Sequence, residues 1–210
     1  MPPEQDASVT ASAAADSIAT EGNAARGRAT DGPPARSPSA TLDWGEPRRK
    51  EVTWYDPLVT KAAVAEMTGL ESMQAIRDGL IPNGPIGYTL EWWFSEAEYG
   101  SCVVQCRPDS SVYNQIGMVH GGFACTILDV AVSCAVRSTL PAGVPYTSIE
   151  LKVNYLRPMT EQSGLISARG WLAKSGRRVG FANAEILDEA GKVLATAQGS
   201  VLILESKGPS

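Results

Sequence analysis

The sequence is short of the residues from which many functional sites are built. It holds one histidine, His120, and its four cysteines, Cys102, Cys106, Cys125 and Cys134, form no C-x-x-C pair. A structural zinc site or a two-histidine metal site is therefore not expected. No apolar run approaches the roughly 20 residues that cross a bilayer, and the first residues lack the pattern of a secretory signal. We expect a cytoplasmic protein with no metal, cofactor or membrane contact.

Basic residues are also in deficit. The 210 residues include 18 Lys and Arg against 23 Asp and Glu, for a formal net charge of −5 and a pI near 5.0. This balance gives no general reason to expect nucleic acid as a partner. The sequence also lacks the G-x-S-x-G, G-x-G-x-x-G and G-x4-G-K-[ST] motifs. The common hydrolase, dinucleotide-binding and P-loop classes are thereby disfavoured.

Large apolar residues are scarce in the first 50 positions, which are rich in Ala, Ser, Thr, Gly and Pro. So little apolar surface does not offset the ordering entropy of roughly 1–2 kcal/mol per backbone residue. We therefore expect a disordered tail over residues 1–50, a helical lead-in packed on the domain over 51–82, and one domain over 83–205. That division suits the length, which allows one ordinary domain with extra sequence.

The rest of the chain predicts an α+β fold. Asp56 followed by Pro57 favours a helix start, and Thr68–Gly69 separates that helix from a second. The run from Phe123 to Val136 is apolar except for Asp129, so the long helix it forms must be enclosed. Alternation in the flanking segments predicts an antiparallel sheet with this helix on one face. The expected helices are 57–67, 70–78 and 123–136, a loop is expected over 80–87, and the expected strands are 87–96, 98–107, 148–158, 164–176, 177–187 and 192–204.

Two glycines, Gly121 and Gly122, open the long helix directly after His120. The first amides of a helix have no intrahelical acceptors, and the helix dipole favours negative charge there. The position therefore suits an oxyanion. Asp129 lies two turns further along, where burial would raise the pKa and the basicity of its carboxylate. On spacing alone, a simpler interpretation stays open: Asp129 belongs to a narrow polar stripe, and the glycines make a tight turn.

The surrounding motifs resemble a known family. Asn114 precedes His120 by six residues, Asp129 follows it by nine, and the runs T-S-I-E-L-K-V-N-Y-L-R-P and K-S-G-R-R come later. Together with a G-L-E-S-M lead-in, they resemble the hotdog-fold acyl-CoA thioesterases of the phenylacetate-degradation (PaaI-type) group, over roughly residues 56–204. The resemblance implies a sheet wrapped around the long helix, and a homodimer, or a dimer of two such dimers, with its active sites at the interface.

The same resemblance implies a role for each matching residue. Asp129 would be the catalytic carboxylate, acting across the interface as nucleophile or as general base for water. The Gly121 amide would form the oxyanion hole, Asn114 and His120 would orient the thioester or the water, and Ser148 would hold the water. Residues implied to bind the acyl-CoA substrate are Gly122, Thr147, Arg157, Lys174, Arg177 and Arg178; Thr147 also makes the register of Ser148 ambiguous by one. For the basic residues, ordinary solvated strand ends are the alternative.

Three other functions stay open at this stage. A hotdog hydratase or dehydratase would use His120 as its base. A non-catalytic acyl-binding module would have the same fold without turnover. An acyl-CoA-sensing transcriptional regulator would use residues 60–79, which superficially match a helix-turn-helix. The second helix of that segment has two acids and one arginine, Arg77, which makes it a poor partner for phosphates. The chemistry favours acyl-CoA thioester hydrolysis, because a thiolate leaves with little help from a general acid.

Overall fold

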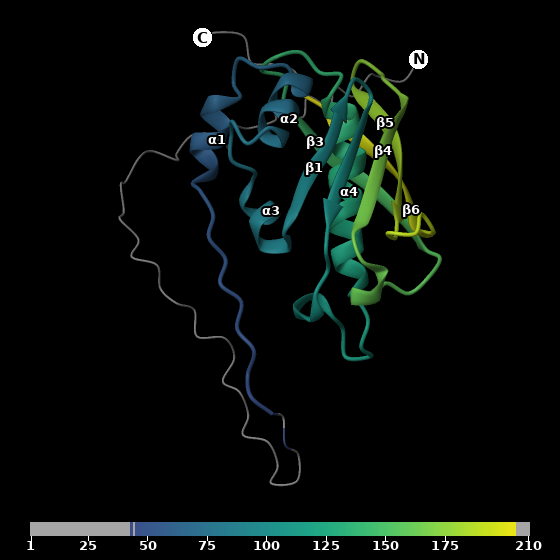
Figure 1. The fold of residues 1–210 in the computed structure, drawn as a ribbon. Coiled ribbons are helices and arrows are strands. Elements are labelled where there is room, and N and C mark those ends of the chain that lie inside the picture. The colour runs from purple at the N-terminus through teal and green to yellow at the C-terminus, as the bar shows by residue number, and fades with distance from the viewer. Residues whose placement is uncertain (1–42, 44, 205–210) are drawn as a thin grey trace, which may run out of the picture. The chain divides into compact units, whose positions relative to one another are not determined.

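The computed structural model describes residue 43 and residues 45–204 (Figure 1). Its contacts divide the chain into Met1–Arg48 and Arg49–Ser210, and all helices and strands given below belong to the second unit. Most of the tail predicted over residues 1–50 lies outside the described residues. No helix in the described part is long and apolar enough to span a membrane.

Six strands form one antiparallel sheet in the order β1-β2-β4-β5-β6-β3. Because β1 and β3 lie at its edges, each pairs with one neighbour only. Along the sequence, two strands precede the long helix and four follow it, as the sequence predicted. Their bounds are β1 Trp92–Glu98, β2 Ser101–Cys106, β3 Tyr146–Tyr155, β4 Ile166–Lys174, β5 Val179–Leu187 and β6 Val193–Ile203.

The long helix α4, Gly121–Arg137, packs along one face of this sheet and contacts strands β2 to β6. Figure 1 shows it running behind β1 and β4 along the length of the strands. Ile127, Leu128 and Ala131 are completely buried at this interface. Gly170 on β4 permits the close approach, since a Cβ there would lie 2.1 Å from the carbonyl oxygen of Ala131. The predicted α+β class, with the helix on one face, is confirmed.

Two short helices precede the sheet. Helix α1, Pro57–Ala63, begins at Asp56, whose carboxylate accepts the Leu58 amide at 2.8 Å. Helix α2, Gly69–Arg77, begins at a capping box in which Thr68 and Glu71 bond to each other's backbone amides. Helix α2 packs on β1 and α4 and buries Met73 completely. Asp56 and Thr68 thus satisfy amides that helix starts leave without acceptors.

The segment before β1 differs from the prediction. Residues 80–87 were expected to be loop and 87–96 a strand, but Pro85–Leu90 form a short helix, α3. Pro85 at the first helical position starts it, and Glu91, in the left-handed region at φ 53°, ends it. Strand β1 therefore begins only at Trp92. The next strand, expected from residue 98, begins at Ser101 because 99–100 make the turn.

Strand β3 also departs from the expected pattern. The alternation of Ile149, Leu151, Val153 and Tyr155 predicted one buried face, and Leu151 and Val153 do pack against the core. Ile149 and Tyr155 are instead 54% and 56% exposed. A bulge between Ser148 and Glu150 shifts the register against β6, which turns Ile149 out of the inward row. The outer edge of the sheet therefore carries large apolar side chains.

Candidate active site

The start of α4 presents one backbone amide without an acceptor. His120 is the N-cap residue; its Nδ1 accepts the Gly122 amide at 2.8 Å, and its carbonyl accepts the Phe123 amide at 3.0 Å. Among residues 45–204, the amide of Gly121 has no hydrogen-bond acceptor. Of the two glycines predicted at the site, Gly121 keeps a free donor, whereas the amide of Gly122 is used in the cap.

The cap also defines how His120 can act. Since Nδ1 accepts a hydrogen bond, the proton of the neutral ring lies on Nε2. The His120 amide donates to the carbonyl of Val112 at 2.8 Å, which ties the cap to the preceding loop. His120 is exposed, so its Nε2–H is available as a donor outside the helix.

Asn114 holds the loop that leads to the cap. Its Oδ1 accepts the amides of Ile116 at 3.1 Å and Met118 at 3.2 Å, and its own amide donates to the Met118 carbonyl at 2.8 Å. These bonds occupy the carbonyl side of the side chain. The Nδ2 amide has no partner within the described part of the chain, so it remains a free donor.

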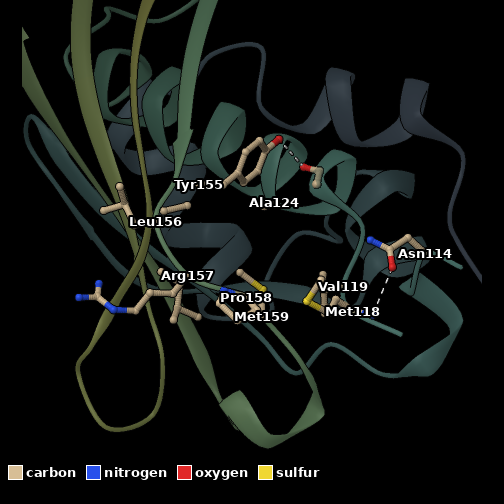
Figure 2. A pocket seen from close by; sticks show the side chains of 12 residues that line it. Asn114, Met118, Val119, Ala124, Tyr155, Leu156, Arg157, Pro158 and Met159 are labelled. Atoms are coloured by element: carbon tan, nitrogen blue, oxygen red, sulfur yellow. Dashed lines mark hydrogen bonds between the residues drawn. The ribbon is translucent and has the colours of Figure 1, made fainter. Parts of the chain in front are cut away.

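Asn114 and Gly121 line the same cavity, which has a volume of about 490 Å³. Figure 2 shows Asn114 on one side of it, Tyr155 on another, and Met118, Pro158 and Met159 between them. The wall is mainly apolar, and that is the usual make-up of a small-molecule site. Residues lining the cavity are Asn114, Met118, Val119, Gly121, Ala124, Tyr155, Leu156, Arg157, Pro158, Met159, Leu194 and Ala195.

Sequence reasoning missed Tyr155 as a member of this site. Its hydroxyl donates to the carbonyl of Gly121 at 3.0 Å and lies 2.9 Å from the thiol of Cys125 (Figure 2 shows the ring directed at the start of α4). The hydrogen bond with Cys125, together with burial, raises the pKa of Tyr155 to about 12. The available signal was its place at the end of an alternating strand, just before the Arg157–Pro158 pair. Tyr155 fixes the backbone of Gly121 from outside the helix.

Asp129 lies on the part of α4 that the sheet does not cover. It is half-buried, within a stripe that also holds Thr126, Ser133 and Arg137, all half-buried. Eight residues separate it from Gly121, which corresponds to about 12 Å along a helix axis. Asp129 and the free amide of Gly121 therefore do not meet within one chain.

Ser148 and Thr147 differ in the face of β3 they occupy. Tyr146 and Ser148 are half-buried and Thr147 between them is exposed, so the first two face the α4 side of the strand. Tyr146 interacts electrostatically with Asp129, which places this inward row near the carboxylate. Thr147 points to the other side of the sheet.

The predicted basic residues fall into two groups. Arg157 lines the cavity at Gly121, although its guanidinium extends outward (Figure 2). The guanidinium donates to the carbonyl of Val193. Arg177 and Arg178 line a separate cavity of about 340 Å³ with Thr139 and Leu140, beyond the other end of α4. Lys174 ends β4 and is exposed. Within one chain, the structure brings only Arg157 to the Gly121 cavity.

A six-stranded antiparallel sheet with one long helix packed along it defines the class of hotdog-fold proteins. The structure of the Escherichia coli PaaI protein, from the phenylacetic acid degradation operon, superposes with a TM-score of 0.58. The match covers 68% of this chain and 97% of that one, at 19% identity. A Streptococcus mutans protein solved with acetyl-CoA has a TM-score of 0.50, over 56% of this chain and 91% of that one, at 19% identity. These likenesses show the fold.

Sequence comparison defines the family. Residues 116–195 match the model of the thioesterase superfamily. A protein of Saccharolobus solfataricus named "Putative esterase" is 30% identical over 110 residues, which are 52% of this chain and 76% of that protein. Another of that name, from Halobacterium salinarum, is 40% identical over 76 residues, 35% of this chain but only 48% of its own length. Human acyl-coenzyme A thioesterase 13 is 25% identical over 46% of this chain and 68% of its own. The chain belongs to the thioesterase superfamily, whose reaction is thioester hydrolysis.

Proposed function

We propose that this protein hydrolyses acyl-CoA thioesters to the free acid and coenzyme A, with no cofactor. The observation that carries the proposal is the unpartnered Gly121 amide at the first position of α4, in the wall of a mainly apolar cavity. An amide at that position has a donor to offer, and the helix dipole favours the negative charge that develops on a thioester carbonyl. The apolar wall suits an acyl group.

Two polar side chains of the same chain, Asn114 and His120, lie with Gly121 in the proposed site. The free Nδ2 of Asn114 and the Nε2–H of His120 are donors that can orient the thioester or the attacking water. Neither needs to give up a bond it makes in the fold, since Asn114 uses Oδ1 and His120 uses Nδ1 for structure. Donors fixed by separate structural bonds are preorganised, which is what transition-state stabilisation requires.

The carboxylate comes from a second protomer in this proposal. Asp129 lies about 12 Å from its own Gly121 along the helix, so a complete site needs another copy of α4. The half-covered stripe of α4 and the free edge of β3, with Ile149 exposed, are the surfaces available for that copy. Asp129 then attacks the carbonyl carbon as nucleophile or activates water as general base, and Ser148 on the inward row of β3 holds that water.

Coenzyme A as the leaving group is supported by two comparisons and by charge. The human relative is named an acyl-CoA thioesterase, and the Streptococcus mutans structure contains acetyl-CoA. Arg157 stands at the cavity of its own chain. Lys174, Arg177 and Arg178 lie past the far end of α4, so a head-to-tail pairing of the helices would bring them toward the partner's Gly121 end. The anionic nucleotide would be held by these four side chains, with Gly122 nearby.

The regulator alternative has less support from the structure. The buried face of α2 packs on β1 and α4, so it is occupied by the domain itself. Arg77, the single arginine of that helix, donates to the neighbouring Asp78 at 2.8 and 3.1 Å. A recognition helix whose only arginine is paired with an acid offers little to a phosphate backbone.

The proposal is tested by assaying a panel of acyl-CoA thioesters with a thiol-detecting reagent. Asp129→Asn should lower kcat by about 10²–10⁴-fold, the range for removing a general base or nucleophile. Asp78→Asn, an exposed carboxylate at the end of α2, is the matched control and should leave activity unchanged. Circular dichroism shows whether both variants fold.

Hydrolysis that survives in folded Asp129→Asn would contradict the role of this carboxylate. If that variant is active and His120→Ala is dead, the hydratase alternative gains support. Absence of activity on every thioester in the panel, with acyl-CoA still bound, would indicate the non-catalytic module instead.

A further inference from the structure

A second cavity, of about 560 Å³, lies between α1, the start of α2, the end of α4 and the loop before β3. Most of its wall is apolar, with Val64, Met67, Leu140 and Val144 among the lining residues. Arg137, which ends α4, is 16 residues from Gly121, or about 24 Å along the helix. The cavity is therefore separate from the candidate active site of the same chain. Helices α1 and α2 also lie outside residues 116–195, the part that matches the family model.

The charge of this cavity has one sign. Among the described residues, its lining includes Arg137 and Lys61 but no aspartate or glutamate. Arg137 is half-buried; its Nη2 donates to Ser72 Oγ at 2.6 Å, and its guanidinium also interacts with the hydroxyl of Tyr146. No carboxylate within the described residues lies at ion-pair distance from it. A partly desolvated guanidinium without a counter-ion is costly, and an anion entering the cavity would remove that cost.

Neutral polar groups in the wall of the cavity also favour an anion as its ligand. Ser72 is 2% exposed and uses its own proton on the Gly69 carbonyl at 2.8 Å, so it offers Arg137 an uncharged acceptor only. Thr60 also lines the cavity, and its hydroxyl is buried with no partner in the described structure. Burial raises the pKa of Tyr146 well above its ordinary value, so this wall residue stays neutral. The site thus combines cations, hydroxyls and an apolar wall.

We propose that this cavity binds an amphipathic monocarboxylate, with its carboxylate against Arg137 and its hydrocarbon body along the wall of α1 and the loop before β3. A guanidinium pairs with a carboxylate through two parallel hydrogen bonds, which a neutral or cationic head group does not allow. The volume lies in the range of small-molecule sites. The same head group is present on a free fatty acid and on the distal end of a dicarboxylic acyl thioester. The second source rests on the proposed function, because only the head-to-tail dimer brings this end of α4 toward the partner's Gly121; the experiment separates the two.

Decanoate is the probe, measured by isothermal titration calorimetry against the full-length protein. We expect saturable binding, with decanol at least about tenfold weaker because it lacks the charge that Arg137 recognises. Arg137→Gln should weaken decanoate by about tenfold or more, whereas Arg169→Gln on the outer face of β4 should leave it unchanged. Val144→Phe, which fills the cavity without touching a charge, should also block binding. It serves in place of Arg137→Gln if that variant does not fold.

Coenzyme A distinguishes the two cavities. Decanoate that still binds with unchanged affinity in saturating coenzyme A, and in Asp129→Asn, occupies the cavity at Arg137 and supports a site for free acids. Decanoate binding that is lost in coenzyme A, or is unaffected by both Arg137→Gln and Val144→Phe, overturns the proposal. Equal affinity for decanol also overturns it. A dicarboxylic acyl-CoA whose KM, alone among the thioesters, rises in Arg137→Gln would identify the distal carboxylate as the ligand. The calorimetric outcomes do not depend on hydrolysis, whereas the KM outcome rests on the proposed function.

Discussion

Among single residues, Cys125 differs from the other three cysteines in its surroundings. Cys102, Cys106 and Cys134 are buried, and burial raises the pKa of each, that of Cys106 to about 12. Cys125 is partly exposed at the start of α4, where its thiol meets the Tyr155 hydroxyl. A thiol needs both exposure and a thiolate form to react.

We therefore expect one fast-reacting thiol in the native protein and four after denaturation. Iodoacetamide followed by peptide mass spectrometry should place the fast label on Cys125. Cys125→Ala should abolish that phase and leave the slow ones as they are. A fast label on Cys106 would show that the sheet opens more readily than its burial implies.

Tyr155, beside this thiol, makes the stability of the fold decrease at alkaline pH. The pKa of Tyr155 is raised from 10.0 to about 12, so its neutral form is favoured in the folded state. The stabilisation that this raised pKa gives the folded state is fully present below the unfolded pKa of 10.0, and it is lost as pH rises through about 12.

Tyr155→Phe keeps the ring and removes the hydroxyl. At neutral pH it should lower the free energy of unfolding by about 0.5–1.5 kcal/mol for each lost hydrogen bond. Between about pH 10 and pH 12 the variant should lose less stability than the wild type. Urea unfolding across this pH range measures both effects. Identical slopes for the two proteins would show that Tyr155 titrates normally in the fold.

At the scale of elements, the capping box of α2 includes a carboxyl group, that of Glu71, whose titration makes the cap sensitive to acid. The backbone amide and then the hydroxyl of Thr68 donate to Glu71 and lower the pKa of its carboxyl below 4.5. A lowered folded pKa stabilises the protein above 4.5, and this contribution disappears as pH falls through the lowered value.

Glu71→Gln retains an acceptor but does not titrate. Its free energy of unfolding should therefore change less than that of the wild type between about pH 5 and pH 3. Glu66→Gln, an exposed residue before the cap, is the matched control and should follow the wild type. If Glu71→Gln is as acid-sensitive as the wild type, the reciprocal bond does not stabilise the fold.

For the whole molecule, the proposed site is shared between two copies, and this predicts complementation. Asp129→Asn and Asn114→Ala would each be inactive as homodimers. A mixed dimer restores one site, which takes Asp129 from one chain and Asn114 from the other.

Refolding the two variants together in equal amounts should therefore recover about a quarter of wild-type activity, since half of the dimers are mixed and each has one intact site. Activity is measured with the thioester on which the wild type is fastest. Ile149→Lys, at the free edge of β3, should prevent recovery and yield monomers in sedimentation. Activity that stays at the level of the separate variants would argue that each chain forms its own site.

Periodicity predicted most of this architecture because the strongest patterns are the longest. The helix over Gly121–Arg137 and the strands after it follow apolar runs and alternation that any packed sheet would need. The errors fall where short-range chemistry competes with that pattern. Pro85 turned an expected loop and strand start into α3, and a bulge in β3 reversed Ile149. A bulge depends on pairing with β6, which a single strand's sequence does not express.

The sequence by itself determined the fold class, the glycine-opened helix, and the spacing of Asn114, His120 and Asp129, because local backbone preferences and apolar periodicity act along the chain. Only the tertiary structure decided which donors remain free. Structural bonds use the Gly122 amide and one side each of His120 and Asn114, and leave the Gly121 amide without an acceptor among the described residues. It also joined Tyr155 to Gly121, and Arg137 to Ser72 beside a cavity whose described lining holds no acid. Such pairings follow from which segments pack together in space, and that is set by the sum of many distant contacts.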